Sequence, residues 1–172
     1  MPPCLDVYVL TPDRTQPCLA QFFDSFVDIA RLETLSPREL QMLPLDYFGP
    51  DDGVDRDHWD TLWVKSSVHA LIRVALEQPW RAWSVHLPPR DPFRSSMLAT
   101  TALGEVVLGI SVDDPNGDNS AIEAASELLA TLADRTHATD GWAVVEEPPP
   151  LTPHIEQPWL SNDVLTSYVA DA

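Results

Sequence analysis

Strand-like and helix-like patterns of apolar residues follow one another along this sequence, and the order in which they occur limits the fold more than any other feature. Short runs rich in β-branched and aromatic residues occupy residues 4–11, 80–89 and 141–147, which is typical of strands. Between them, longer stretches repeat apolar residues every three or four positions, which predicts amphipathic helices. Prolines and glycines end most of these segments. The chain is therefore expected to combine strands and helices around one core.

The helical spacing predicts a long first helix, which Thr15 caps and in which Pro17 suits the first turn. A short helix that begins at a capped proline is predicted next. Two further amphipathic helices follow, one before Pro79 and one in the second half of the chain. The predicted helices are residues 15–33, 36–43, 66–78 and 120–133.

Residues 95–114 supply apolar strand material on both sides of Leu103 and Gly104. This segment is either one long bent strand or a hairpin, and the glycine followed by a charged residue favours the hairpin. The resulting order is strand, helix, extra helices, two or three strands, helix and strand. It predicts an α+β fold with a ferredoxin-like, mostly antiparallel sheet, helices on one face and a helical insertion at about 34–79.

Residues 1–150 are expected to form a single domain, and residues 151–172 a proline-rich extension. The end of the extension is predicted to be a short tail helix. The apolar residues of this tail are Val164, Leu165, Tyr168 and Val169. Because the tail is too apolar to float freely, it either docks on the domain or contacts a partner, such as a second copy in a homo-oligomer.

Charge is the strongest global feature, since 27 acidic residues against 10 Lys and Arg give a formal net charge of −17. Such a field repels nucleic acids and anionic lipids and favours a basic protein partner. The sequence has no apolar run of about 18 residues and does not begin with a basic and then apolar leader, so we expect a cytoplasmic protein and no membrane association. Cys4 and Cys18 are then expected to be reduced packing residues.

Residues 111–123 (SVDDPNGDNSAIE) place oxygen-bearing side chains around a glycine, as a calcium loop does. With Gly117 at the sixth position of such a loop, the first ligand position falls on Val112, which has no side-chain oxygen. A turn followed by a helix explains the same residues, because Ser120 and Glu123 have the spacing of a capping box. We therefore favour the helix start, and no metal or cofactor is predicted.

Signals of catalysis are weak. The histidines and cysteines lack zinc spacings, no serine stands in a nucleophile elbow, and no glycine-rich phosphate loop precedes a helix. Cys18 is predicted to be buried rather than reactive. Glu146 and Glu147 end the last strand and His86 lies on a middle strand, so an open face of the sheet could bring them together for acid–base work. No catalytic residue is predicted.

Acidic residues and indole rings gather in an irregular loop at 44–60 and beside the proline-rich tail. Long loops often carry binding sites, and Trp is enriched at the centres of interfaces. We expect Trp83 and Trp142 to be core residues and the loop and tail residues to form a docking patch. The predicted binding residues are Asp51, Asp52, Asp55, Asp57, His58, Trp59, Asp60, Trp63 and Trp159.

As a class, the chain resembles the small acidic cytoplasmic immunity proteins of bacterial polymorphic-toxin systems. The resemblance lies in LDVYVLTPDRT…FFDSFVD and in GEVVLGISVDD…GWAVVEEPPP, and it covers about two-thirds of the chain. It implies a protein that neutralises a cognate toxin by occluding the toxin's site, with acidic side chains that steer association. Two alternatives stay open: a small enzyme or ligand-binding domain with a pocket between sheet and insertion, and a structural subunit of a homo-oligomer.

Overall fold

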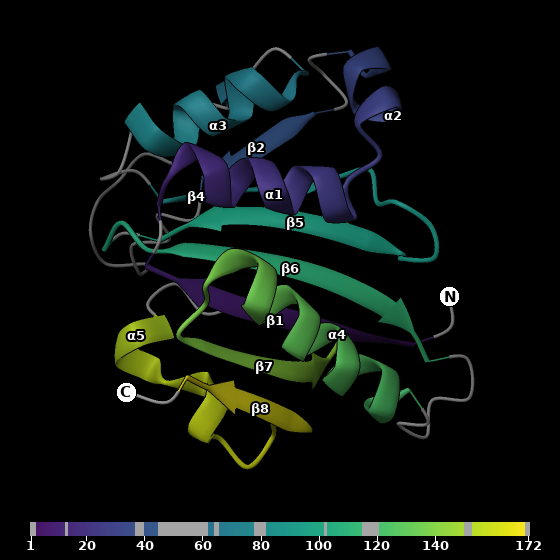
Figure 1. Ribbon diagram of the computed structural model, residues 1–172, viewed down its shortest axis with the longest axis vertical. Helices are drawn as coiled ribbons and strands as arrows, with labels where there is room; N and C mark the ends of the chain where they lie inside the picture. The colour runs from purple at the N-terminus through teal and green to yellow at the C-terminus, as the bar shows by residue number, and fades with distance from the viewer. Residues whose placement is uncertain are drawn as a thin grey trace, which may run out of the picture.

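The computed structural model of the chain describes residues 3–12, 14–36, 40–44, 62–63, 66–77, 82–101, 103–114, 121–149 and 153–170. Within these residues, eight strands form one sheet in the order β3-β2-β4-β5-β6-β1-β7-β8 (Figure 1). Every pair of neighbouring strands is antiparallel. The predicted α+β class with a mostly antiparallel sheet is confirmed.

The longest strands, β1 and β6, lie side by side near the middle of the sheet. The strands are β1 Cys4–Thr11, β2 Gln41–Pro44, β3 Leu62–Trp63, β4 Trp83–Leu87, β5 Ser95–Thr100, β6 Val106–Asp113, β7 Asp140–Val145 and β8 Thr166–Val169. The helices are α1 Gln16–Phe26, α2 Ile29–Thr34, α3 Val68–Glu77, α4 Ile122–Thr136, α5 Pro153–Glu156 and the 3-10 turn η2 Pro158–Leu160. None of the helices in the described ranges has the length and apolar character needed to cross a bilayer.

The side chains of β1 alternate between the two faces of the sheet, as the pleat requires. Leu5 and Val7 belong to the main core, which lies under α1, α3 and α4 (Figure 1). Tyr8 points to the other face, where it belongs to a smaller buried cluster together with Trp142. We call this second face, turned away from α1, α3 and α4, the open face.

The first helix begins as predicted but ends early. The Thr15 side chain accepts a hydrogen bond from the backbone N–H of Cys18, and Pro17 lies in the first turn. Val27 is extended, and the Asp28 side chain then caps a separate helix, α2, so the prediction of one helix to residue 33 is wrong. A β-branched valine followed by a favoured N-cap residue explains the break at this point.

The helix predicted at 36–43 is wrong, because residues 41–44 form β2. Met42 pairs with Val85 of β4, and Gln41 pairs with Trp63 of β3. Pairing with β4 outweighs the local helical spacing, since strand formation depends more on neighbours than on intrinsic preference. The insertion therefore adds two strands to the sheet as well as α3, which matches the helix predicted at 66–78.

The turn between β5 and β6 confirms the hairpin. Gly104 lies in this turn with φ of 82°, a left-handed conformation that glycine adopts without strain. The Arg14 side chain supports the turn from outside: its Nη1 donates to the Gly104 carbonyl at 2.7 Å, and its Nε donates to the Ala75 carbonyl in α3 at 2.6 Å. One guanidinium thus ties the hairpin to the end of the insertion.

Helix α4 is the helix predicted from residue 120. Its buried stripe includes Leu128, Leu129 and Leu132. The N-cap residue is Ala121, which provides no side-chain cap, so the predicted capping box is wrong in that respect. The turn that precedes it, including Ser120, lies outside the described residues.

The tail forms a strand, so the predicted tail helix is wrong. β8 pairs with β7, and Tyr168 stands opposite Gly141. Leu165 and Tyr168 pack on the main core, while Val164 packs on the smaller cluster of the open face. Thr, Tyr and Val favour strands, and β7 offers an edge with which they pair. The tail therefore docks on the body of its own chain.

Candidate functional site

Three polar side chains form a row on the open face, across the neighbouring strands β1, β6 and β5. Asp6 of β1 stands opposite Ser111 of β6, and Ser111 stands opposite Ser95 of β5. Residues paired across antiparallel strands point to the same face, so these three side chains share one surface. On the far side of β1, the chain leaves β7 and turns at Glu146, which has φ of 49°. This turn brings a second carboxylate to the same end of the sheet.

Asp6 is the most important residue of this row because it is an acidic residue that is only 9% exposed. The Ser111 hydroxyl donates a hydrogen bond to Asp6 Oδ1 at 2.5 Å. Burial raises the pKa of Asp6 above its ordinary value, and the negative charge of Glu146 adds to this effect; the Ser111 hydrogen bond and the positive charge of Arg94 oppose it. The ionised form of this carboxyl group is therefore destabilised in the folded protein.

A cavity of about 420 Å³, which we call the Asp6 pocket, opens above this row. Its floor includes Gly109, over which the ring of Tyr8 lies so closely that a Cβ at position 109 would come within 2.7 Å of the ring. The Tyr8 hydroxyl donates to the backbone carbonyl of Glu147 at 2.8 Å. A glycine on β6 thus allows a tyrosine on β1 to hold the segment after β7 in place.

The rim of the Asp6 pocket carries both signs of charge. Arg94 lies 3.3 Å from the carboxylate of Asp113 at the end of β6. His86 Nδ1 lies 3.4 Å from the hydroxyl of Ser95. Among the described lining residues, three are acidic, Asp6, Glu146 and Glu147, and one, Arg94, carries a guanidinium. The described lining residues therefore include more acidic than basic groups, which favours a positively charged ligand.

Cys4 lies beside the two carboxyl groups of the pocket. Its Sγ is 3.9 Å from Asp6 Oδ1 and 4.0 Å from Glu146 Oε1. Burial and the neighbouring Asp6 charge raise the pKa of this thiol. A reactive cysteine requires a lowered pKa, so this environment does not activate Cys4 as a nucleophile.

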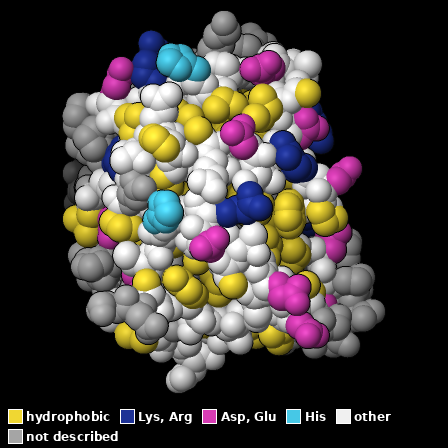
Figure 2. Space-filling view, in the orientation of Figure 1, with side chains coloured by type: hydrophobic (Ala, Val, Ile, Leu, Met, Phe, Trp, Pro, Cys, Tyr) yellow, Lys and Arg dark blue, Asp and Glu magenta, His cyan; other side chains and the backbone are white. Residues whose placement is uncertain are grey.

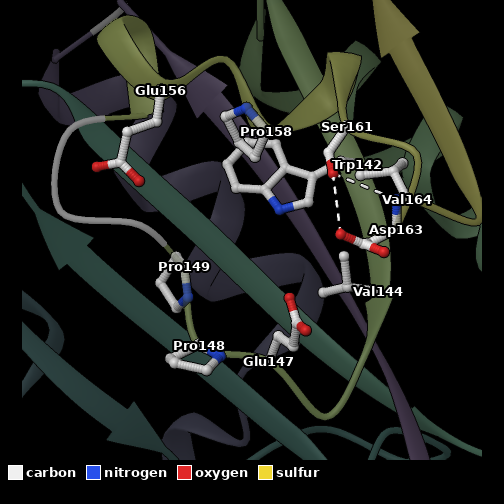
Figure 3. A pocket seen from close by; sticks show the side chains of 10 residues that line it. All are labelled: Trp142, Val144, Glu147, Pro148, Pro149, Glu156, Pro158, Ser161, Asp163 and Val164. Atoms are coloured by element: carbon white, nitrogen blue, oxygen red, sulfur yellow. Dashed lines mark hydrogen bonds between the residues drawn. The ribbon is translucent and has the colours of Figure 1, made fainter.

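A second cavity of about 540 Å³, which we call the Trp142 pocket (Figure 3), shares the lining residues Glu147 and Pro148 with the first. Figure 3 shows the side chains of Glu147, Glu156 and Asp163 around the indole of Trp142. The Ser161 hydroxyl is 3.3 Å from Asp163 Oδ2 and accepts from the Asp163 backbone N–H at 3.2 Å, which orders that turn. Strand β7, α5 and η2 together build this acidic hollow.

The loop part of the predicted docking patch lies outside the described residues: Asp51, Asp52, Asp55, Asp57, His58, Trp59 and Asp60. Trp63 is in β3 and Trp159 is in η2, but the structure describes only the backbone of these two residues. The docking patch therefore stays a prediction.

Two other expectations are confirmed, and a possibility that the sequence raised agrees with the structure. Trp83 and Trp142 are core residues, 2% and 1% exposed. Cys18 is buried, with its Sγ 3.2 Å from the backbone carbonyl of Thr136. His86 and Glu146 both line the Asp6 pocket, as the open-face hypothesis for these residues expected. The Asp6 pocket lies on the open face, and a separate cavity of about 600 Å³ lies between α1 and the insertion helix α3.

Sequence reasoning missed Asp6, Ser111 and Arg94 as pocket residues. One signal was present: Asp6 is the only charged residue in an otherwise apolar first strand, CLDVYVLT. An acid in the middle of a central strand is an unusual choice for a buried position, where charged residues are rarely found unless paired.

Charge on the helix-covered face has a different character. Figure 2 shows acidic side chains there mostly as separate residues, with Lys or Arg and His side chains between them.

Across the described parts of the chain, no group of three or more His, Cys, Asp or Glu has the arrangement of a metal site.

Comparison of the chain with protein-family models, curated proteins and solved structures found no match.

Proposed function

We propose that this protein is an acidic binding protein that takes a positively charged group of a protein partner into the Asp6 pocket. One observation carries the proposal: Asp6, which is only 9% exposed, stands on the open face of the sheet and lines a cavity whose described lining residues include more acidic than basic groups.

The charged form of Asp6 is destabilised by burial. A buried carboxylate is unfavourable unless it is paired and hydrogen-bonded. Ser111 supplies one hydrogen bond, whereas Arg94 is drawn toward Asp113 at 3.3 Å. A guanidinium or ammonium group that enters the pocket would add to the favourable charge that Arg94 already provides, and charge-assisted hydrogen bonds of this kind are about twice as strong as neutral ones.

The test uses a ligand that presents only the charged group. Nα-acetyl-arginine amide is expected to bind and to shift the amide resonances of residues in β1 and β6, with affinity that falls as ionic strength rises. Nα-acetyl-citrulline amide, which has the same shape without the charge, is the matched control. Equal shifts with both ligands would contradict the proposal, and so would unchanged arginine binding at high salt.

Within this class, we propose an immunity protein of a bacterial toxin system that acts in the cytoplasm. The resemblance of the sequence to such proteins and the net charge of −17 support this narrower proposal. A cognate toxin, encoded beside this gene, is expected to associate rapidly at low salt and about ten-fold or more slowly at high salt. If the association rate of a neighbouring toxin does not change with ionic strength, the proposal that acidic side chains steer its association is contradicted.

A second candidate function, a small enzyme, has one observation in its favour: His86, Glu146 and Asp6 line the same cavity. Such a set would permit general acid–base catalysis if the groups shared a proton path. However, the His86 ring contacts Ser95 at 3.4 Å, and the Cys4 thiol is not activated. Binding therefore explains the described geometry better than catalysis does.

We further propose that the central strands form a ferredoxin-like core. The order β7-β1-β6-β5, with α1 after β1 and α4 between β6 and β7, supports this assignment. Strands β4, β2 and β3 would then be additions on one side, and β8 an addition on the other.

A further inference from the structure

We propose that the two pockets of the open face act as one furrow, which binds an extended segment of the partner that carries two basic residues, one in each pocket. This inference rests on the proposed binding function and adds the form of the ligand. We call the Asp6 pocket and the Trp142 pocket together the open-face furrow.

The two pockets adjoin each other. Glu147 and Pro148 line both of them, so their walls meet at the segment that follows β7. The hydrogen bond from the Tyr8 hydroxyl to the Glu147 carbonyl, at 2.8 Å, fixes this segment against β1. A ligand chain can therefore pass from one pocket to the other along a single, anchored boundary.

The Trp142 pocket has the chemistry of a second cation site. Its lining residues in the described ranges include three carboxylates, Glu147, Glu156 and Asp163, and no Lys or Arg. Three prolines also line it: Pro148, Pro149 and Pro158. Proline has no N–H to donate, so their backbones offer only carbonyl acceptors, which suit the donor-rich head of arginine or lysine.

The size of the furrow favours a chain over a single group. The pockets have volumes of about 420 and 540 Å³, each within the range of about 300–1,000 Å³ that is typical of sites for whole small ligands. Trp142 lines its pocket although it is only 1% exposed. A charged side chain would then lie above the ring, among the carboxylates, while the ligand backbone continues over Pro148.

The experiment compares peptides with one and with two charges. The probes are acetyl-Arg-(Gly)n-Arg-amide with n from zero to four, and the same peptides with citrulline as the second residue. Binding at two linked sites is expected to raise affinity by about ten-fold or more at the spacing that fits both pockets. The Glu156→Gln/Asp163→Asn double variant is expected to remove this gain, while acetyl-arginine amide still causes the wild-type shifts in the amide resonances of β1 and β6, beside the Asp6 pocket.

Each failure has a separate meaning. If no spacing improves on the citrulline peptides, the furrow proposal is overturned while the Asp6 pocket stands. If acetyl-arginine amide itself does not bind, the proposed function fails. If spermidine binds as tightly as the best peptide, the furrow recognises a small polyamine and the partner-segment proposal is overturned. Circular dichroism and melting temperatures of the double variant, in which both substituted residues are exposed, verify that it folds.

Discussion

The Asp6→Asn variant is expected to be more stable than the wild type at pH 7 and, at the same time, to bind acetyl-arginine amide about ten-fold or more weakly. Burial raises the pKa of Asp6 in the folded protein above its value in the unfolded chain. The folded protein therefore holds this proton more tightly than the unfolded chain does. Stability is lost as pH rises from the unfolded pKa through the folded pKa, and asparagine avoids this loss because it does not ionise.

Urea unfolding at pH 3 and pH 7 measures the stability part. The two proteins are expected to differ at pH 7 and to converge at pH 3, where Asp6 is protonated in both states. Asn can still accept the Ser111 hydrogen bond, so the variant keeps the neutral geometry of the site. Asp24→Asn, an exposed acid on α1, is the control and is expected to change neither property. A destabilised Asp6→Asn protein that binds arginine normally would contradict both halves.

Trp142→Ala is expected to lower the free energy of unfolding by about 3–5 kcal/mol, the usual loss when a buried aromatic residue is truncated. Trp142 is 1% exposed, and its ring centroid lies 5.6 Å from that of Tyr8. Both rings belong to the small cluster that supports the open face. The variant is therefore also expected to loosen the segment that Tyr8 holds.

Val145→Ala provides the matched comparison, because this residue follows on the same strand and is 42% exposed. Its substitution is expected to change stability by less than about 1 kcal/mol. Chemical denaturation of both variants gives the two differences. Similar small losses for both would show that the Trp142 side chain is not part of a packed core.

Local sequence patterns were sufficient to predict several helices and strands and one turn. The first strand, α3 and α4 have clear periodicity, and Gly104 marks the hairpin turn. Two of the failures came where pairing with a distant strand decides the structure. Gln41–Pro44 becomes a strand because β4 lies beside it, and Thr166–Val169 becomes a strand because β7 offers an edge. Apolar spacing in so short a segment fits a helix or a strand equally well.

The Asp6 pocket was harder to foresee for the same reason. Ser111 and Asp6 are 105 positions apart, and only the register of β1 with β6 brings them together. The turn at Glu146 has φ of 49° but contains no glycine at this position, so the sequence gives no sign of a left-handed residue there. The sequence did indicate that Glu146 and His86 could share an open face, because each lies on or beside a strand, but the buried acid at the centre was missed.

The most direct test of the central claim is a carbon-13 NMR titration of the Asp6 side-chain carboxyl group, with and without acetyl-arginine amide. Our account expects the pKa of Asp6 to be above its ordinary value in the free protein and to fall when the arginine derivative is bound, since a positive charge stabilises the carboxylate. An ordinary pKa in the free protein, or one that the arginine derivative leaves unchanged, would contradict the claim that this pocket receives a positive charge.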